Sequence, residues 1–269
     1  MQLIKQNYPF WAGMFALGII SLSALAAPWL VRYEPSVQVS PAENRFLPPS
    51  ADHWMGTDQF GRDVFARLLY GGRISLFIGL LVVFTSVLFG TLYGAVSGFL
   101  GGFWDQVLMR LVDVFLAFPV VFLAVTCMAL FGTGIVWLVL VLTLTSWMDV
   151  ARLVRSEVLS LKESSFILKA RAVGLGSARI VLRHLIPNAM ATVVTVAVIR
   201  VADVILIESA LSFLGLGVQP PVSSWGSIIN DGRSVLSLAW WLTLFPGLAI
   251  AATTISFNMI GDGIQSVRR

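Results

Sequence analysis

The stretch FILKARAVGLGSARIVLRHLIPN, residues 166–188, is a short basic segment in a strongly apolar chain. It carries Lys169, Arg171, Arg179 and Arg183, although the 269 residues as a whole are 57% hydrophobic and only 12% charged. A soluble domain has about 25% charged residues. The composition therefore predicts an all-α membrane protein in which this segment connects apolar helices outside the bilayer.

Apolar runs long enough to cross a membrane account for most of the chain. A membrane-spanning helix needs about 20 mostly apolar residues. We expect six transmembrane helices, over residues 9–31, 74–99, 107–131, 134–158, 189–216 and 237–261.

The distribution of Lys and Arg beside these runs predicts their orientation. Lys5, Arg110, Arg268 and Arg269 would face the cytoplasm together with the basic residues of 152–183. The basic residues of the opposite 32–73 loop are balanced by its acidic residues. A multi-pass protein with both termini in the cytoplasm fits this pattern best.

The segment between the fourth and fifth spans has its own helical pattern. Phe166, Ile167, Ala170 and Val173 recur at helical spacing. Gly174 suits a helix stop, since glycine accepts a left-handed turn. We expect a short helix within 163–176 near the inner membrane surface, then a glycine turn, then a second stretch that ends at Pro187.

Several kinds of chemistry are absent from the sequence. The single cysteine, Cys127, has no disulfide partner in the chain, and the isolated His53 and His184 give no metal cluster. No lysine follows a glycine as Gly-Lys-Ser/Thr requires, so there is no ATP-binding P-loop. The charges lie in loops rather than on one soluble face, which argues against nucleic acid. We expect a non-catalytic membrane subunit without a cofactor of its own.

Residues 168–187 resemble the cytoplasmic EAA loop of ABC-importer permeases. In that pattern Glu-Ala-Ala precedes a glycine by three residues, and Ile-x-Leu-Pro follows nine residues after it. Gly174 and Pro187 match at the same spacing, whereas Leu168 replaces the glutamate. This match alone leaves open a lipid-surface helix held by anionic head groups.

Longer matches extend the resemblance over residues 45–264. HWMGTDQFGRDVFARLLYGGRISL (53–76) and ESALSFLGLGVQPPVSSWGSIIND (208–231) resemble the dipeptide, oligopeptide and nickel permease subfamily, as do FPGLAI (245–250) and FNMIGDGI (257–264). The resemblance implies a type I ABC-importer permease-like fold with a cytoplasmic coupling helix, in the bacterial inner membrane.

The resemblance also implies partners and a mechanism. The protein partners are a homologous second permease, one or two ATP-binding subunits that use ATP and Mg²⁺, and an extracytoplasmic substrate-binding protein. Membrane lipid surrounds the spanning helices. Loop 159–188 would couple ATP hydrolysis to alternating access for peptides, or for nickel as such or chelated. The residues expected to contact the ATPase are Phe166, Ile167, Lys169, Ala170, Arg171, Gly174 and Pro187.

The 1–73 region contains the first span and an extracytoplasmic loop, and its signature has two interpretations. The residues concerned are Gly56, Thr57, Asp58, Gly61, Arg62 and Asp63. They could form an outer gate or a contact for the binding protein. Alternatively, Asp–Arg pairs could simply hold the loop together, because Asp and Thr bond nearby backbone groups in tight turns.

Charges in the 74–264 core are expensive in a membrane and usually functional. Arg200 and Asp203 share a helix face and can neutralise each other, as can Arg110 and Asp113. Glu208 has no obvious local partner. We therefore regard Arg200, Asp203 and Glu208 as candidates for the translocation path or a subunit interface, with structural neutralisation as the alternative.

Two further expectations complete the sequence interpretation. Pro119 and Pro246 each remove a helix hydrogen bond and favour kinks. Residues 265–269 form a short cytoplasmic tail.

A secondary transporter driven by an ion gradient is the alternative function, and it would need an ion site at mid-membrane.

Overall fold

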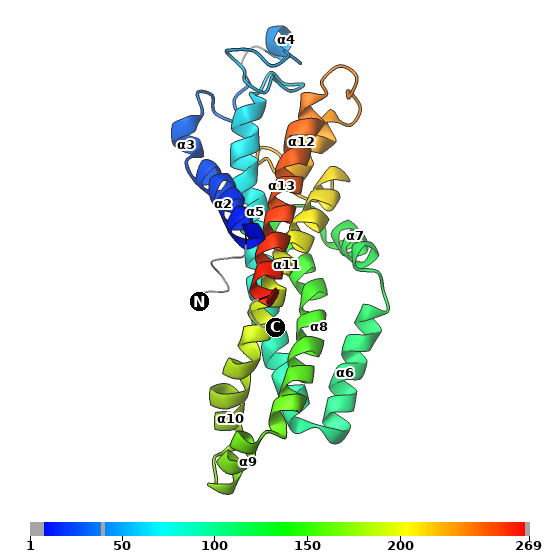
Figure 1. Ribbon diagram of the computed structural model, residues 1–269. Coiled ribbons are helices and arrows are strands. Elements are labelled where there is room, and N and C mark those ends of the chain that lie inside the picture. Colours follow the sequence, from blue (N-terminus) through cyan, green and yellow to red (C-terminus); the bar gives the residue numbers. More distant parts are fainter. Residues whose placement is uncertain (1–7, 39–40, 267–269) are drawn as a thin grey trace. The chain divides into compact units, whose positions relative to one another are not determined.

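The computed structural model describes residues 8–38 and 41–266, and in that part of the chain the extended regular elements are helices (Figure 1). Lys5, Arg268, Arg269 and most of the expected 265–269 tail lie outside the described residues. The elements are α2 Tyr8–Leu25, α3 Ala27–Leu30, α4 Pro41–Asn44, α5 Val64–Leu100, α6 Gly102–Leu116, α7 Val120–Phe131, α8 Ile135–Lys162, α9 Ser165–Ala172, α10 Ser177–Ile180, the π-helix η1 Val181–Leu185, α11 Ile186–Phe213, α12 Trp225–Gly232 and α13 Trp241–Ser266.

The expected six spans correspond to five continuous helices and one broken pair. α2, α5, α8, the continuous helix 177–213 and α13 are each long and apolar enough to cross a membrane. Many of their large apolar side chains are exposed, among them Phe15, Phe84 and Leu144. Exposed apolar side chains on spanning helices are what a hydrocarbon solvent requires, and the all-α membrane fold is confirmed.

The third span is bent where Pro119 stands. α6 and α7 differ in direction by 80° across the break between Leu116 and Val120. Proline disfavours helical backbone in the residue before it, here Phe118, so the helix stops and restarts. The kink expected at Pro119 is confirmed, whereas α13 continues through Pro246 as one helix.

The second span begins earlier than expected. α5 starts at Val64 rather than at residue 74. The charged residues Arg67 and Arg73 suggested a loop, but Arg67 is buried and paired with carboxylates, so the helix can include it.

By internal contacts the chain forms two compact units. Unit 1 comprises residues 1–80, 127–139 and 198–269, and unit 2 comprises 81–126 and 140–197. Helices α5, α8 and α11 contribute residues to both units. The division expected at residue 73 is a functional one and stays a prediction.

Unit 1 is held together by close helix contacts. α2 packs along α13, and a Cβ at Gly13 would lie 2.8 Å from the Ser256 carbonyl oxygen. A Cβ at Gly263 would lie 2.6 Å from Cβ of Phe10. Small residues allow such approach in lipid, where no hydrophobic effect drives helices together.

Unit 2 is built on a glycine stripe. Gly90, Gly94 and Gly98 of α5 face the backbone carbonyls of Trp147, Ala151 and Arg155 on α8, one turn apart each time. Gly94 and Gly98 therefore serve the close packing of α5 on α8. Gly101 and Gly102 act differently, since both have positive φ and form the turn between α5 and α6.

Candidate functional site

The basic segment forms a short helix with a defined end. α9 ends at Ala172, Val173 is its C-cap residue, and Gly174 adopts φ +82°. The Gly174 N–H donates to the Arg171 carbonyl at 2.9 Å and the Leu175 N–H to the Ala170 carbonyl at 3.1 Å. These two bonds form a Schellman motif, which satisfies carbonyls at the helix end. The expected short helix and glycine stop are confirmed.

The second stretch does not end at Pro187, contrary to our expectation. α10, η1 and α11 form one continuous helix over 177–213, with Pro187 near the start of α11. Proline in a regular α-helix lacks a donor and clashes with the carbonyl four residues earlier. The wider π-helical turn at Val181–Leu185 lies directly before it, and the Ile186 N–H donates to the Val181 carbonyl. This local widening gives room to the proline ring.

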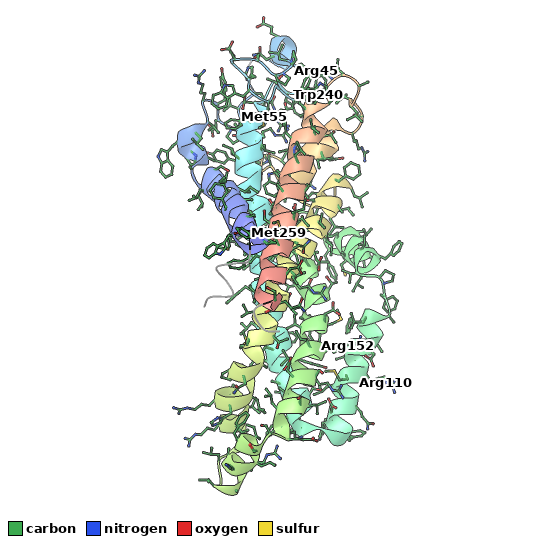
Figure 2. The ribbon with its side chains drawn as sticks, in the orientation of Figure 1. Arg45, Met55, Arg110, Arg152, Trp240 and Met259 are labelled. Atoms are coloured by element: carbon green, nitrogen blue, oxygen red, sulfur yellow. The ribbon has the colours of Figure 1, made fainter. Side chains whose placement is uncertain are left out.

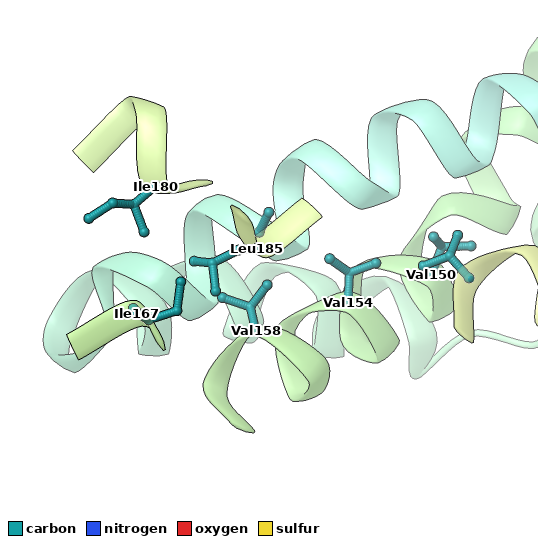
Figure 3. Close-up of a cluster of buried hydrophobic side chains, with 8 residues drawn as sticks. Val150, Val154, Val158, Ile167, Ile180 and Leu185 are labelled. Atoms are coloured by element: carbon teal, nitrogen blue, oxygen red, sulfur yellow. The ribbon is translucent and has the colours of Figure 1, made fainter. Parts of the chain in front are cut away.

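Only part of the expected contact face of α9 is open to a partner. Ile167 is fully buried against Val154 and Val158 of α8 and against Ile180 and Leu185 (Figure 3). The expectation that Ile167 faces a partner is therefore wrong, because this side chain anchors α9 to unit 2. The exposed apolar side chains are instead Phe166 at 40%, Leu168 at 53% and Val173 at 82%.

The basic residues around α9 are partly fixed by α5. Lys169 and Arg171 are exposed, as expected. The Arg171 guanidinium lies 5.5 Å from the centroid of the Phe99 ring, and Lys162 donates to the Phe99 carbonyl at 2.7 Å. Cation–π contacts of this kind fix the orientation of an exposed guanidinium. The role of these residues, and of Ala170, in ATPase contact stays a prediction.

A carboxylate that sequence reasoning missed stabilises the same end of unit 2. Asp105 is buried and accepts bonds from Nε and Nη2 of Arg155, both at 2.6 Å, and from Ser97 Oγ at 2.6 Å. A bidentate Arg–carboxylate pair is stronger than a neutral hydrogen bond and has a fixed geometry. It ties α6 and α8 to the glycine-rich end of α5.

The expected Arg110–Asp113 pair is replaced by a contact between helices. Asp113 accepts from Arg152 of α8, and Arg110 lies on the outer side of α6 in Figure 2. Residues three apart on one helix can pair, but here the neighbouring helix presents a guanidinium to the same carboxylate. Both residues of the Asp113–Arg152 pair are about half-exposed.

The outer-loop signature forms a buried ion network. Asp58, fully buried, accepts from Arg62 Nε at 2.6 Å and from Arg67. Asp231 of α12 accepts from Nη2 of both arginines, at 3.4 Å from Arg62 and 2.8 Å from Arg67. Charges removed from water must be paired in this way. The arrangement favours the interpretation that Asp–Arg pairs hold the loop together.

The remaining signature residues shape the same loop. Thr57 Oγ1 donates to the Asn44 carbonyl at 2.6 Å, and Trp241 Nε1 donates to the Thr57 carbonyl at 3.0 Å. Asp63 caps α5 through the Ala66 N–H and contacts His53 Nδ1 at 2.9 Å. Gly56 and Gly61 both have positive φ, as tight turns require. A gate role for this loop stays a prediction.

Glu208 has partners that the sequence did not reveal. It is fully buried in unit 1 and accepts from Ser212 Oγ at 2.8 Å, Ser75 Oγ at 3.0 Å and Ser209 Oγ at 3.3 Å. Ser75 Oγ also accepts from the Trp225 N–H at 3.3 Å. Glu208 therefore joins α5, α11 and α12, and the expectation that it lacks a local partner is wrong.

The Arg200–Asp203 pair has the expected geometry. Arg200 Nη1 lies 3.9 Å from Asp203 Oδ2, with side chains 33% and 49% exposed. Charged groups inside a span face a bundle interior, water or a partner. Their place in a pathway or interface stays a prediction.

Among residues 8–38 and 41–266 no group of three His, Cys, Asp or Glu residues is arranged to hold a metal ion.

Comparison with known proteins gives two family matches. The family described as "Binding-protein-dependent transport system inner membrane component" matches residues 72–267. The family described as "N-terminal TM domain of oligopeptide transport permease C" matches residues 2–49. Together these matches cover nearly the whole chain.

Several curated relatives are similar along most of their length. The dipeptide transport system permease protein DppC of Bacillus subtilis is 40% identical, over 97% of this chain and 82% of its own. The oligopeptide transport system permease protein OppC of the same organism is 36% identical, over 98% and 86%. The glutathione transport system permease protein GsiD of Pectobacterium atrosepticum is 37% identical, over 98% and 87%.

Proposed function

Because this chain belongs to the family of binding-protein-dependent transport system inner membrane components, we propose that it is the permease subunit of an ATP-driven peptide importer. It forms one half of the translocation pathway in the inner membrane. Its relatives are permeases for dipeptides, oligopeptides and glutathione, itself a small peptide. Peptides are therefore the favoured cargo over nickel or a nickel chelate.

The observation that carries the mechanism is the exposure of large apolar side chains on more than one side of α9 and at its C-terminal end. Phe166, Leu168 and Val173 are exposed beside Lys169 and Arg171. Ile167 holds the other side of the same helix in the core. Large apolar side chains that are exposed outside the spanning helices mark a contact with a protein or with the membrane surface. Because the chain belongs to a family of transport-system permeases, we assign this exposed surface of α9 to the ATPase subunit, with the cationic residues beside it.

This assignment implies a complex with separate roles. The sequence has no Gly-Lys-Ser/Thr motif, so ATP and Mg²⁺ are bound by partner subunits. A homologous permease supplies the second half of the pathway, and an extracytoplasmic protein delivers the peptide. Both termini and α9 lie on the cytoplasmic side, as the basic residues of 152–183 favour.

Co-purification in mild detergent tests the proposal. The chain is expected to recover a P-loop ATPase and a second permease, identified by mass spectrometry. Leu168→Asp places a charge on the exposed surface of α9 and is expected to lose the ATPase while keeping the second permease. Leu236→Asp is the matched control, because Leu236 is 54% exposed in the loop before α13. Retention of the ATPase by Leu168→Asp as fully as by the control would refute the assigned surface.

A further inference from the structure

A large groove in unit 1 has no role in the proposed transport mechanism. It has a volume of about 930 Å³ and lies among α2, α5 and two connecting segments, 34–36 and 221–223. Its walls are mostly apolar, including Leu17 and Leu25 of α2 and Phe77 and Leu80 of α5. Volumes of this order hold sizeable ligands.

The lining of the groove also includes polar residues and both signs of charge. Arg73 and Glu34 both line it, with Tyr70, Ser36 and Ser223. Arg73 is exposed, and its guanidinium carbon lies 5.4 Å from the centroid of the Tyr70 ring. Within the described residues no carboxylate lies within ion-pair distance of Arg73, and the Glu34 carboxylate accepts only a long bond, from Ser36 Oγ at 3.5 Å. A cation and an anion are thus both available to a ligand.

The combination of apolar walls and two opposite charges selects the ligand chemistry. Helices α2 and α5 are both long and apolar enough to cross a membrane, so a groove lined by them is within reach of membrane lipid. A guanidinium binds phosphate oxygens in a fixed fork, and a carboxylate accepts hydrogen bonds from an ammonium group. An acyl chain is stabilised when its apolar surface packs against apolar walls, and it occupies neither charged group.

We propose that this groove binds a zwitterionic phospholipid whose head group carries a primary amine. The phosphate lies at Arg73, the amine at Glu34, and an acyl chain lies along Leu17, Leu25, Phe77 and Leu80. The bound lipid fills the space between the first span and α5. This site does not depend on the identity of the cargo or on the ATPase.

Native mass spectrometry of the purified complex tests the site. The complex is incubated with vesicles of phosphatidylethanolamine, phosphatidylglycerol or phosphatidylcholine, and retained lipid per chain is measured. Phosphatidylethanolamine is expected to be retained best. Equal retention of phosphatidylglycerol would overturn the role of Glu34, and equal retention of phosphatidylcholine would overturn the requirement for a primary amine. Retention of none of the lipids, or a second protein chain cross-linked into the groove, would overturn the proposal.

Matched variants separate the groove from general lipid contact. Leu25→Trp, which fills the groove, and Arg73→Gln are expected to lower phosphatidylethanolamine retention by about fivefold, the upper range for an exposed ion pair. Leu22→Trp and Arg32→Gln are the controls, because these residues do not line the groove. Leu22 is about as exposed as Leu25, at 66% against 62%, so both tryptophan substitutions are expected to leave the fold intact. Equal retention by all four variants would refute the site.

Discussion

Replacing Gly174 tests whether the end of α9 is fixed by backbone conformation. Gly174 has φ +82° and Gly176 has φ −64°, while a Cβ at either position meets no atom within 4 Å. Gly174→Val and Gly176→Val therefore differ in backbone strain rather than in packing. A non-glycine residue in the left-handed region costs about 1–2 kcal/mol. That energy shifts the balance between ordered and frayed α9 by about five- to thirtyfold.

Two assays follow from this difference. Hydrogen–deuterium exchange at residues 165–175 of the purified complex is expected to accelerate in Gly174→Val and to stay unchanged in Gly176→Val. Peptide-stimulated ATP hydrolysis in proteoliposomes is expected to fall in the first variant alone, while membrane insertion of both variants stays normal. Equal exchange and equal stimulation in the two variants would refute the role of the Gly174 turn.

Three further predictions concern stability, measured by thermal unfolding in detergent. Gly94→Leu is expected to destabilise the protein by about 3 kcal/mol, because its side chain would collide with the α8 backbone; Gly18→Leu, in open space on α2, is expected to change little. Asp105→Asn is expected to cost about 1–3 kcal/mol through its lost bidentate pair, whereas Asp113→Asn, half-exposed, costs about 0–1 kcal/mol. Glu208→Leu is expected to destabilise the protein by about 1–3 kcal/mol, because it leaves serine hydroxyls unpaired, and Glu208→Gln is expected to destabilise it less. A smaller loss of stability in the leucine variant than in the glutamine variant would contradict the hydrogen-bonded arrangement.

Local patterns made several features predictable. The turn at Gly174 depends on the conformational freedom of one residue, and the break before Val120 depends on Pro119. The spans follow from their length and polarity. In each case the physical cause lies within a few residues, so the sequence alone is enough to identify it.

Features that depend on distant segments were not predictable. Asp231 completes the Arg62–Arg67 network although it lies far along the chain, on α12. Ser75 reaches Glu208 from another helix in the same way. The burial of Ile167 was missed for a related reason: an apolar stripe on a short helix has the same spacing whether it packs on the chain's own core or on a partner.

The most direct test of the account is uptake of a labelled dipeptide into proteoliposomes containing the purified complex and its binding protein. ATP is supplied on the ATPase side with ion gradients collapsed, or an ion gradient is supplied without ATP. The account predicts uptake with ATP alone, and its loss in the Leu168→Asp variant. Uptake with the ion gradient alone would contradict it and would identify a secondary transporter.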